Sequence, residues 1–446
     1  MRRARSGRRL PGPAARAGLA AVLGLAAVLG LSAASAPTAG AAEPPRPPQG
    51  PLPTETSCFT CHAMLEAEPT ERAANDIHFA KGLSCHDCHG GDPLAGADGD
   101  PEAAHNPAKG FRGRPARAAV PQFCARCHAD AAFMKRYDPH ARVDQLSEYL
   151  TSKHGLRLQK GDTRVAVCVD CHGVHGIRAA SDPRSPVHAT RVAETCARCH
   201  NDAALMDPYG LLPGQHEEYR RSVHARALYE RGDLSAPTCN DCHGSHGAVP
   251  PGVESIANVC GTCHVREATL FRETEAKRNL DLEACIQCMV CHDNHAVLPP
   301  TDAMLGVGEE STCTGCHAEG EPEYDASAQM GEAVVRLKGR LGEATELLER
   351  AERAGVEVGP DRFALQKAHD QLVESRVLAH SFDLERFMAA ANEGLAAADA
   401  GVAAGHRAFA ELRVRRTGLA LSLVVIVAVI AALTMTIRAI ERKAPG

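Results

Sequence analysis

The chain has very few aromatic side chains for its length. Its 446 residues include no tryptophan, six tyrosines and ten phenylalanines, so aromatic residues make up 4% of the sequence. Aromatic side chains bury the most surface per residue and usually dominate a core. A conventional core built from side chains alone is therefore not expected, and cofactors are the obvious candidates to fill the interior.

The first 41 residues contain no carboxylate. MRRARSGRRL carries arginines, Ala17 to Leu31 is apolar, and Ala39-Gly40-Ala41 provides small residues for cleavage. This order of features predicts a secretory signal peptide at residues 1–41. Its removal takes away six arginines and no acidic residue, so the formal charge falls from -6 to -12. A chain this acidic is not expected to bind nucleic acid.

After a proline-rich linker at residues 42–57, the cysteines follow one rule. The pattern C-x-x-C-H occurs nine times and uses eighteen of the nineteen cysteines. The paired cysteines are Cys58 and Cys61, Cys85 and Cys88, Cys124 and Cys127, Cys168 and Cys171, Cys196 and Cys199, Cys239 and Cys242, Cys260 and Cys263, Cys288 and Cys291, and Cys313 and Cys316. The histidines that follow them are His62, His89, His128, His172, His200, His243, His264, His292 and His317. We number these motifs 1 to 9 in chain order.

This spacing is typical of covalent haem c attachment. Two thiols three residues apart lie on one side of a helical turn and can form thioethers to the two vinyl groups of one porphyrin, while the next histidine binds the iron. Zinc sites or disulfides are the alternatives, since exported chains can oxidise cysteines and C-x-x-C pairs bind zinc. Neither alternative explains a histidine after the second cysteine in all nine motifs. The sequence therefore predicts nine covalently attached haem c groups.

Nine haems in residues 58–320 would leave little protein between porphyrins. A small-molecule reaction needs one such centre, whereas moving electrons over a distance needs several in a row. The number of motifs therefore favours a non-enzymatic electron-transfer protein, with an enzyme as the alternative.

Fourteen histidines lie outside the motifs and could bind the opposite face of an iron. Nine are predicted as such second ligands, most because they recur in similar local sequences: His78, His140, His154, His175, His188, His224, His246, His295 and His380. In CHGVHG, CHGSHG and CHDNHA the second histidine lies within about one helical turn of the motif histidine and cannot reach around the same porphyrin. His175, His246 and His295 are therefore expected to serve a neighbouring iron or to contact a propionate. His86, His105, His216 and His406 have no recurring context and are as well explained as surface residues.

An imperfect internal repeat is present. His154, Cys168, His175 and Cys196 recur as His224, Cys239, His246 and Cys260, and a third copy from Cys288 to Cys313 lacks the upstream histidine. Cys285 in CIQCMVCH is left over, and a buried or a reactive thiol would both explain it.

The C-terminal quarter has a different character. Residues 326–412 contain no cysteine, and apolar positions from Val334 to Ala351 step by three and four, which predicts an amphipathic helix. Breaks at Gly359-Pro360 and at Ser381-Phe382-Asp383 divide this region into helical segments. Together these segments are expected to form a helical stalk of hairpin or coiled-coil type. His369 and His380 are eleven residues apart and are expected on the same helix face, where they either cap a bundle seam or bind iron; of the two, His380 is preferred as a ligand.

Residues 418–437 carry no charge and are long enough, at about 1.5 Å per helical residue, to cross a bilayer. With an exported body, residues 438–446 form a cytoplasmic tail. The fold class expected is a body of short helices and irregular segments packed on haem, followed by a helical stalk and one C-terminal transmembrane helix.

The nine motifs, CHGVHG, CHGSHG and HFAKGLSCHDCHGGDP together resemble the periplasmic multihaem c-type cytochromes of the class III and tetrahaem superfamily. The resemblance implies bis-histidine haems in close pairs and electron transfer between a membrane donor, such as the quinone pool, and soluble redox proteins. It implies attachment to the inner membrane with the haem domain on the periplasmic side. The alternative is a multihaem reductase with one open iron, acting on nitrite, hydroxylamine or tetrathionate; no C-x-x-C-K motif marks such a haem.

Overall fold

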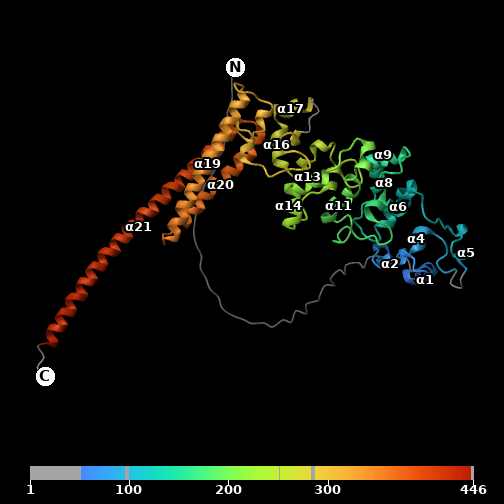
Figure 1. Cartoon of the computed structure of the whole chain (residues 1–446), viewed down its shortest axis with the longest axis horizontal. Coiled ribbons are helices and arrows are strands. Elements are labelled where there is room, and N and C mark those ends of the chain that lie inside the picture. Colours follow the sequence, from blue (N-terminus) through green and yellow to red (C-terminus); the bar gives the residue numbers. More distant parts are fainter. Residues whose placement is uncertain (1–51, 96–99, 251, 283–286, 443–446) are drawn as a thin grey trace, which may run out of the picture. The chain divides into compact units, whose positions relative to one another are not determined.

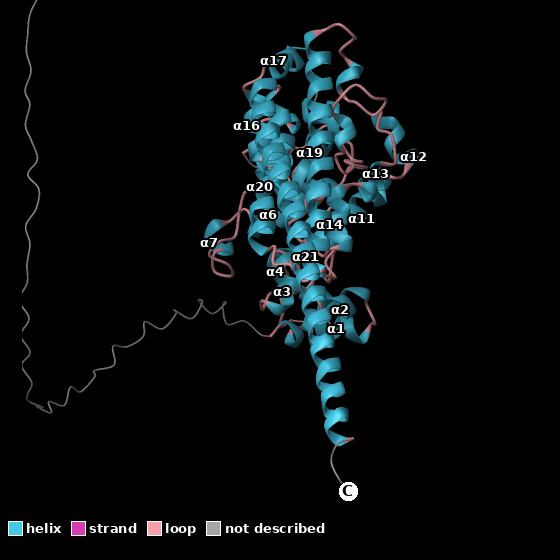
Figure 2. Ribbon diagram, turned by 90° about the vertical axis from the view of Figure 1, so that its left-hand side faces the viewer, coloured by secondary structure: helices cyan, strands magenta, loops and turns pink. Residues whose placement is uncertain are grey.

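The computed structural model describes residues 52–95, 100–250, 252–282 and 287–442. These residues form helices and connecting loops and contain no strand (Figure 2). The expected signal peptide, residues 42–51 of the linker and Cys285 lie outside the described residues. The mostly helical fold class expected from the sequence is confirmed.

Residues 52–321 form a body of short helices. Its α-helices are α1 (Ser57–Met64), α2 (Glu68–Ala73), α3 (Ile77–Ala80), α4 (Cys85–His89), α5 (Pro101–Ala104), α6 (Val120–His128), α7 (Ala131–Met134), α8 (Gln145–Thr151), α9 (Lys153–Gln159), α10 (Cys168–His172), α11 (Ala189–His200), α12 (Ala203–Met206), α13 (Gln215–Arg221), α14 (Val223–Glu230), α15 (Cys239–His243), α16 (Val265–Arg272), α17 (Glu275–Leu282) and α18 (Gln287–His292). Single 3₁₀ turns are η1 (Pro53–Glu55), η2 (Pro107–Lys109), η3 (Arg117–Ala119), η4 (Asp207–Tyr209), η5 (Ile256–Asn258), η6 (Cys260–Thr262), η7 (Asp302–Met304) and η8 (Cys313–Gly315).

The internal repeat appears as a helix pair joined by a buried hydroxyl residue. Ser152 joins α8 to α9, Ser222 joins α13 to α14, and Thr274 joins α16 to α17. Each hydroxyl accepts a hydrogen bond from the backbone N–H three residues later, at 3.0 to 3.1 Å. This is the N-cap interaction that satisfies one of the free donors of a helix start. The three caps therefore set a common register for the three units.

The body has little hydrophobic core of its own. Its buried apolar residues form three small clusters, around Val120 and Val167, around Ala193 and Tyr219, and around Ala227 and Leu228. The large cluster lies elsewhere, in the C-terminal helices. The part of the chain that carries the motifs therefore has little apolar packing of its own.

The C-terminal helices are α19 (Pro322–Arg353), α20 (Gly359–Leu378), the turn η9 (Ala379–Ser381) and α21 (Leu384–Glu441), and they pack together (Figure 1). Val334, Leu337 and Leu348 of α19 are fully buried against Phe387 and small residues of α21. α20 begins at Gly359, and Phe382, at a φ of 51°, turns the chain into α21. These helices form a bundle, and α21 runs without a break into a segment long and apolar enough to cross a membrane.

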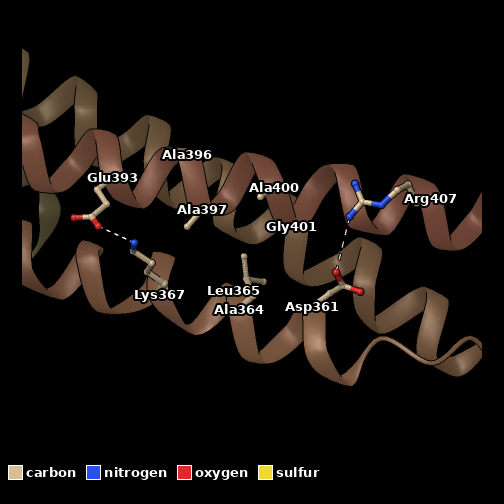
Figure 3. Close-up of a pocket in the computed structure, with 10 residues that line it drawn as sticks. All are labelled: Asp361, Ala364, Leu365, Lys367, Glu393, Ala396, Ala397, Ala400, Gly401 and Arg407. Carbon is tan, nitrogen blue, oxygen red and sulfur yellow. Dashed lines mark ion pairs between the residues drawn. The ribbon is translucent and has the colours of Figure 1, made fainter. Parts of the chain in front are cut away.

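The close approach of α21 depends on glycine. A Cβ added at Gly405 would lie 2.6 Å from the Cβ of Leu347, and one at Gly394 would lie 2.9 Å from Leu337. A groove of about 360 Å³ remains between α20 and α21, with Lys367–Glu393 and Arg407–Asp361 ion pairs across it (Figure 3). It contains none of the motif residues.

The bundle also contacts the last part of the body. Asp302 of η7 pairs with Lys338 of α19 and Arg376 of α20, both at 2.8 Å. The hydroxyl of Ser327 donates to the carbonyl of Gly306 at 2.8 Å. Motifs 8 and 9 are therefore held against the same end of the bundle.

Candidate haem sites

The nine motifs sit on single helical turns, which places both cysteines on one side. Six motifs lie on α1, α4, α6, α10, α11 and α15, a seventh lies on α18, and η6 and η8 carry the other two. In motifs 2, 4 and 6 the aspartate before the second cysteine accepts from the backbone N–H just before the motif: Asp87 from Ser84, Asp170 from Val167 and Asp241 from Thr238, at 2.7 to 2.8 Å. These local bonds fix the turn on which the cysteines are displayed.

Eight of the nine motif histidines face a second imidazole from elsewhere in the chain. The ring centroids of every pair are 6.0 to 6.4 Å apart. The pairs are His62–His105, His89–His175, His128–His78, His172–His246, His200–His154, His243–His295, His264–His224 and His292–His380.

This separation is the one that an iron atom between two imidazoles requires. Two metal–nitrogen bonds of about 2 Å place the nitrogens about 4 Å apart and the ring centroids about 6 Å apart. Direct stacking or contact of two rings would allow shorter separations as well. Eight pairs within so narrow a range therefore fit bis-histidine haem.

Several of these imidazoles use Nδ1 for a hydrogen bond. His89 Nδ1 lies 2.8 Å from the carbonyl of Gly113, and His380 Nδ1 lies 3.0 Å from the carbonyl of Val377. A carbonyl only accepts, so Nδ1 carries the proton and Nε2 presents a lone pair. This is the tautomer that a metal ligand needs.

Burial keeps many of the paired rings neutral. Burial is the largest influence that lowers the pKa of His128, His154, His172, His175, His200, His224, His243, His246 and His292. A neutral imidazole binds a metal without first losing a proton.

The three histidines of the repeated CHGxHG-type segments each face a motif two positions earlier. His175 follows motif 4 and faces His89 of motif 2, and His246 follows motif 6 and faces His172 of motif 4. His295 follows motif 8 and faces His243 of motif 6. One segment thus carries a ring for its own site and a ring for another site, which fixes the relation between the two.

The sequence predictions of second ligands differ from this arrangement at two positions. His140 is exposed, and His188 caps α11, with its Nδ1 2.8 Å from the hydroxyl of Thr190. Neither faces a motif histidine, whereas the other seven predicted residues do. His105, which had no recurring context, faces His62; its sequence signal is that it alone lies between motifs 2 and 3. His369 is exposed beside Asp370.

Thiols of consecutive motifs are neighbours along the whole series. Burial raises the pKa of Cys58, Cys88, Cys171, Cys242 and Cys291, and a thiol of the next motif raises each of them further, namely Cys85, Cys127, Cys199, Cys263 and Cys313. Between the remaining motifs, the thiols of Cys168, Cys239 and Cys260 raise the pKa of Cys124, Cys196 and Cys288. Up to motif 8, the neighbouring thiols are alternately the first cysteines and the second cysteines of two consecutive motifs. The sites therefore follow one another in chain order.

The body also contains buried polar atoms that lack a protein partner. Among the described residues they are His86 Nδ1, Tyr137 Oη, Asp144 Oδ1, Gln145 Oε1, Asn201 Oδ1, Gln215 Oε1, His216 Nε2, Tyr229 Oη and Asn240 Oδ1. All belong to the segment between motifs 2 and 6. Orphaned polar atoms usually contact a missing group, and the propionates of a haem would suit the donors among them.

Asp76 is a functional residue that the sequence analysis missed. It is 7% exposed, and its carboxylate accepts from His78 Nδ1 at 2.9 Å and from the backbone N–H groups of Gly176 and Ile177 at 2.6 and 2.9 Å. It therefore orients His78 and anchors the loop that carries His175. The signal was local: Asp76 stands two residues before His78, as an N-cap does.

Motif 9 is different. None of the other histidines, all of which lie in the described residues, faces His317 within the separation of the eight pairs. Its Nδ1 lies 3.2 Å from a carboxylate oxygen of Glu321 and 4.0 Å from one of Glu323, and its side chain is 40% exposed.

Known proteins point to the same class. Residues 42–90, which contain motifs 1 and 2, match the family described as cytochrome c554 and c-prime. A stretch of 303 residues is 25% identical to the multiheme cytochrome MtrA of Shewanella baltica, covering 59% of this chain and 76% of that protein. No solved structure gives a significant match. With its motifs, its imidazole pairs and these two similarities, the chain is a multihaem c-type cytochrome.

Proposed function

We propose that the chain is a membrane-anchored nonahaem cytochrome that carries electrons along a row of haems between a quinone-pool donor and periplasmic redox proteins. Each motif holds one haem c through two thioethers and its own histidine. The second ligands at sites 1 to 8 are His105, His175, His78, His246, His154, His295, His224 and His380.

The observation that carries this proposal is the continuity of the row. Thiols of every consecutive pair of motifs are close enough to influence one another, from Cys58 in motif 1 to Cys313 in motif 9. Thioethers at these sulfurs would bring the edges of successive porphyrins together. A protein that only positions and shields such haems transfers electrons and catalyses no further reaction.

The protein's own contribution at each site is to hold the iron ligands and to exclude water. At sites 1 to 8 an imidazole on each side would bind iron in both oxidation states, so little rearrangement would accompany electron transfer. Carboxylate and carbonyl acceptors at Nδ1, as at His78 and His89, fix the ring and strengthen its donation.

The proposed anchor is the apolar segment of α21, with an expected signal peptide directing the body to the periplasm. Between Leu384, beside the turn that carries His380, and Gly418, where the apolar segment begins, α21 has 34 residues. At about 1.5 Å per residue this helix holds site 8 about 50 Å from the apolar segment along its axis. We therefore expect that a protein which takes electrons from the quinone pool and rises from the membrane, instead of quinol itself, meets the end of the row formed by sites 8 and 9.

A second candidate function is supported by His317. Because no histidine faces it, site 9 could keep an open iron, as in a multihaem reductase for nitrite, hydroxylamine or tetrathionate. The conduit is preferred because eight sites are fully provided with ligands and only one is open.

One experiment separates the two functions. The full-length holoprotein is reduced in detergent and mixed in a stopped-flow instrument with an oxidised soluble c-type cytochrome or with each of the three small substrates. A conduit passes electrons from all its haems to the protein acceptor and shows no sustained turnover of nitrite, hydroxylamine or tetrathionate. Sustained turnover of any of them, faster than electron transfer to the cytochrome, would replace the conduit by the reductase.

A further inference from the structure

The three capped units share a register from before the cap to well after it. Three residues before each cap is an aromatic ring: Tyr149, Tyr219 and Phe271. Six residues after each cap is a leucine: Leu158, Leu228 and Leu280. With caps at Ser152, Ser222 and Thr274 that accept the same hydrogen bond, the units align without a gap.

The residue two positions after the cap supplies the second ring to sites 3, 5 and 7. His154, two after Ser152, faces His200 of motif 5, and His224, two after Ser222, faces His264 of motif 7. Helix α3 follows the same rule, because Asp76 caps α3 and His78 faces His128 of motif 3. Each cap thus delivers its histidine to the motif after the next one in the chain.

In the third capped unit this position is Ala276. The register would direct it to motif 9, whose His317 has no facing imidazole. An alanine methyl group offers no lone pair to a metal. The cap at Thr274, the ring of Phe271 and Leu280 are retained, so only the ligand is exchanged.

We propose that the ninth haem, bound by Cys313 and Cys316, has an open coordination position opposite His317. At this position the iron binds a small exogenous molecule through one lone pair. The inference rests on the proposed function, since it requires a haem at motif 9. Site 9 is then the open one of the nine sites, and it is open because Ala276 stands where the other two capped units have a histidine.

The proximal side of this site supports the assignment. His317 is the motif histidine whose Nδ1 meets a carboxylate, that of Glu321 at 3.2 Å. A carboxylate that accepts the Nδ1 proton makes the imidazole a stronger donor to iron. Strong donation from one axial ligand compensates for a missing second ligand and tunes what the iron binds. At 40% exposure, His317 is also near solvent, from which a small ligand would come.

The test restores the ligand. In Ala276→His the register places an imidazole opposite His317, and Ala276→Leu is the control that adds bulk without a nitrogen. The full-length ferric holoproteins are compared by electron paramagnetic resonance, and the ferrous proteins are titrated with carbon monoxide. Intact mass under denaturing conditions counts the haems in each variant.

The wild-type protein and Ala276→Leu should each show one high-spin haem in nine, and the wild-type protein should bind one carbon monoxide per chain. In Ala276→His the high-spin signal and carbon monoxide binding should be lost, with nine haems retained. His224→Ala, which recreates at site 7 the situation of site 9, should double both the high-spin signal and the carbon monoxide bound.

Two results would overturn the inference, and they differ in what else they affect. Nine haems that are all low-spin in the wild type would mean that another residue binds site 9, while the conduit would stand. A methionine–iron charge-transfer absorption in the wild-type protein would identify that residue as a methionine. A mass with fewer than nine haems and free thiols at Cys313 and Cys316 would instead refute the haem count of the proposed function.

Discussion

Replacing Asp76 by asparagine tests whether one buried carboxylate secures the second ligands of two haems. Hydrogen bonds from His78, Gly176 and Ile177 lower the pKa of Asp76 to about 2, against the opposing effect of burial, from an ordinary value of 3.8. At about 1.4 kcal/mol per pKa unit, this difference corresponds to about 2.5 kcal/mol, or about 60-fold in an equilibrium constant. Asp76→Asn should weaken the attachment of His78 and of the His175 loop by about this amount.

The sign of the pH dependence follows from the depressed pKa. The carboxylate contributes its stability above about pH 4, where it is ionised in folded and unfolded protein alike, and loses it as the pH falls through about 2. In the wild-type protein, sites 2 and 3 should therefore become easier to open between pH 4 and pH 2. In Asp76→Asn they should be weaker at neutral pH, and the additional weakening that the carboxylate causes between pH 4 and pH 2 should be absent.

The assay is a guanidinium titration of the ferric holoprotein at pH 6 and at pH 3, followed by the high-spin absorption that appears when a second ligand is lost. Asp202→Asn is the control, because Asp202 only caps α12 and touches no histidine. At pH 6 the midpoint for the loss of two ligands should fall in Asp76→Asn and stay unchanged in Asp202→Asn. Equal midpoints in both variants, or an unchanged pH dependence in Asp76→Asn, would refute the reasoning.

Three further predictions concern single elements of the account. His246→Ala should keep all covalent haems but convert one haem from low-spin to high-spin, because the thioethers and His172 remain, whereas His140→Ala should leave the spectrum unchanged; identical spectra for the two would remove His246 from site 4. A chain ending at Thr417 should be soluble in the periplasm with its full complement of haem, and loss of haem on truncation would show that the membrane segment is needed for the body. Gly405→Ala should destabilise the bundle by about 1–3 kcal/mol through overpacking, and Gly339→Ala, where the added methyl group meets nothing, should stabilise it by up to about 1 kcal/mol; hydrogen exchange of the bundle amides would measure both, and equal effects would contradict the close packing of α21.

The motif histidines could be predicted from the sequence because the groups that would bind one haem lie next to one another in each motif. Two thiols and an imidazole within five residues need only one helical turn to act together. The bundle was equally accessible, since the apolar spacing from Val334 to Ala351 predicts the buried face of α19. Both signals are local.

The facing histidines depend on which turns meet in space, and local sequence gave an incomplete answer. His188 shares a nearby serine with His154 and His224, yet it caps α11 with its own ring instead of following a cap by two residues. His105 has no such context and faces His62 because the loop after motif 2 returns to α1. Asp76 has a local signal, its position two residues before His78, but its contact with Gly176, one hundred residues away, could not be predicted from the sequence.

The register of the caps explains what the repeat alone left open. Sequence comparison indicates that the third copy lacks its upstream histidine, but not which residue replaces it. The hydrogen bond from Lys277 to Thr274 fixes the start of α17 and so identifies Ala276. The histidine missing from the third copy is therefore replaced by Ala276.

The central claim, a row of nine haems, is tested most directly by the intact mass of the full-length protein, measured under denaturing conditions that remove every group not covalently bound. The account predicts the mass of the processed chain plus nine haems, with Cys285 as the single cysteine left for alkylation. A mass with six haems or fewer, or with additional alkylated cysteines in the C-x-x-C-H motifs, would contradict it.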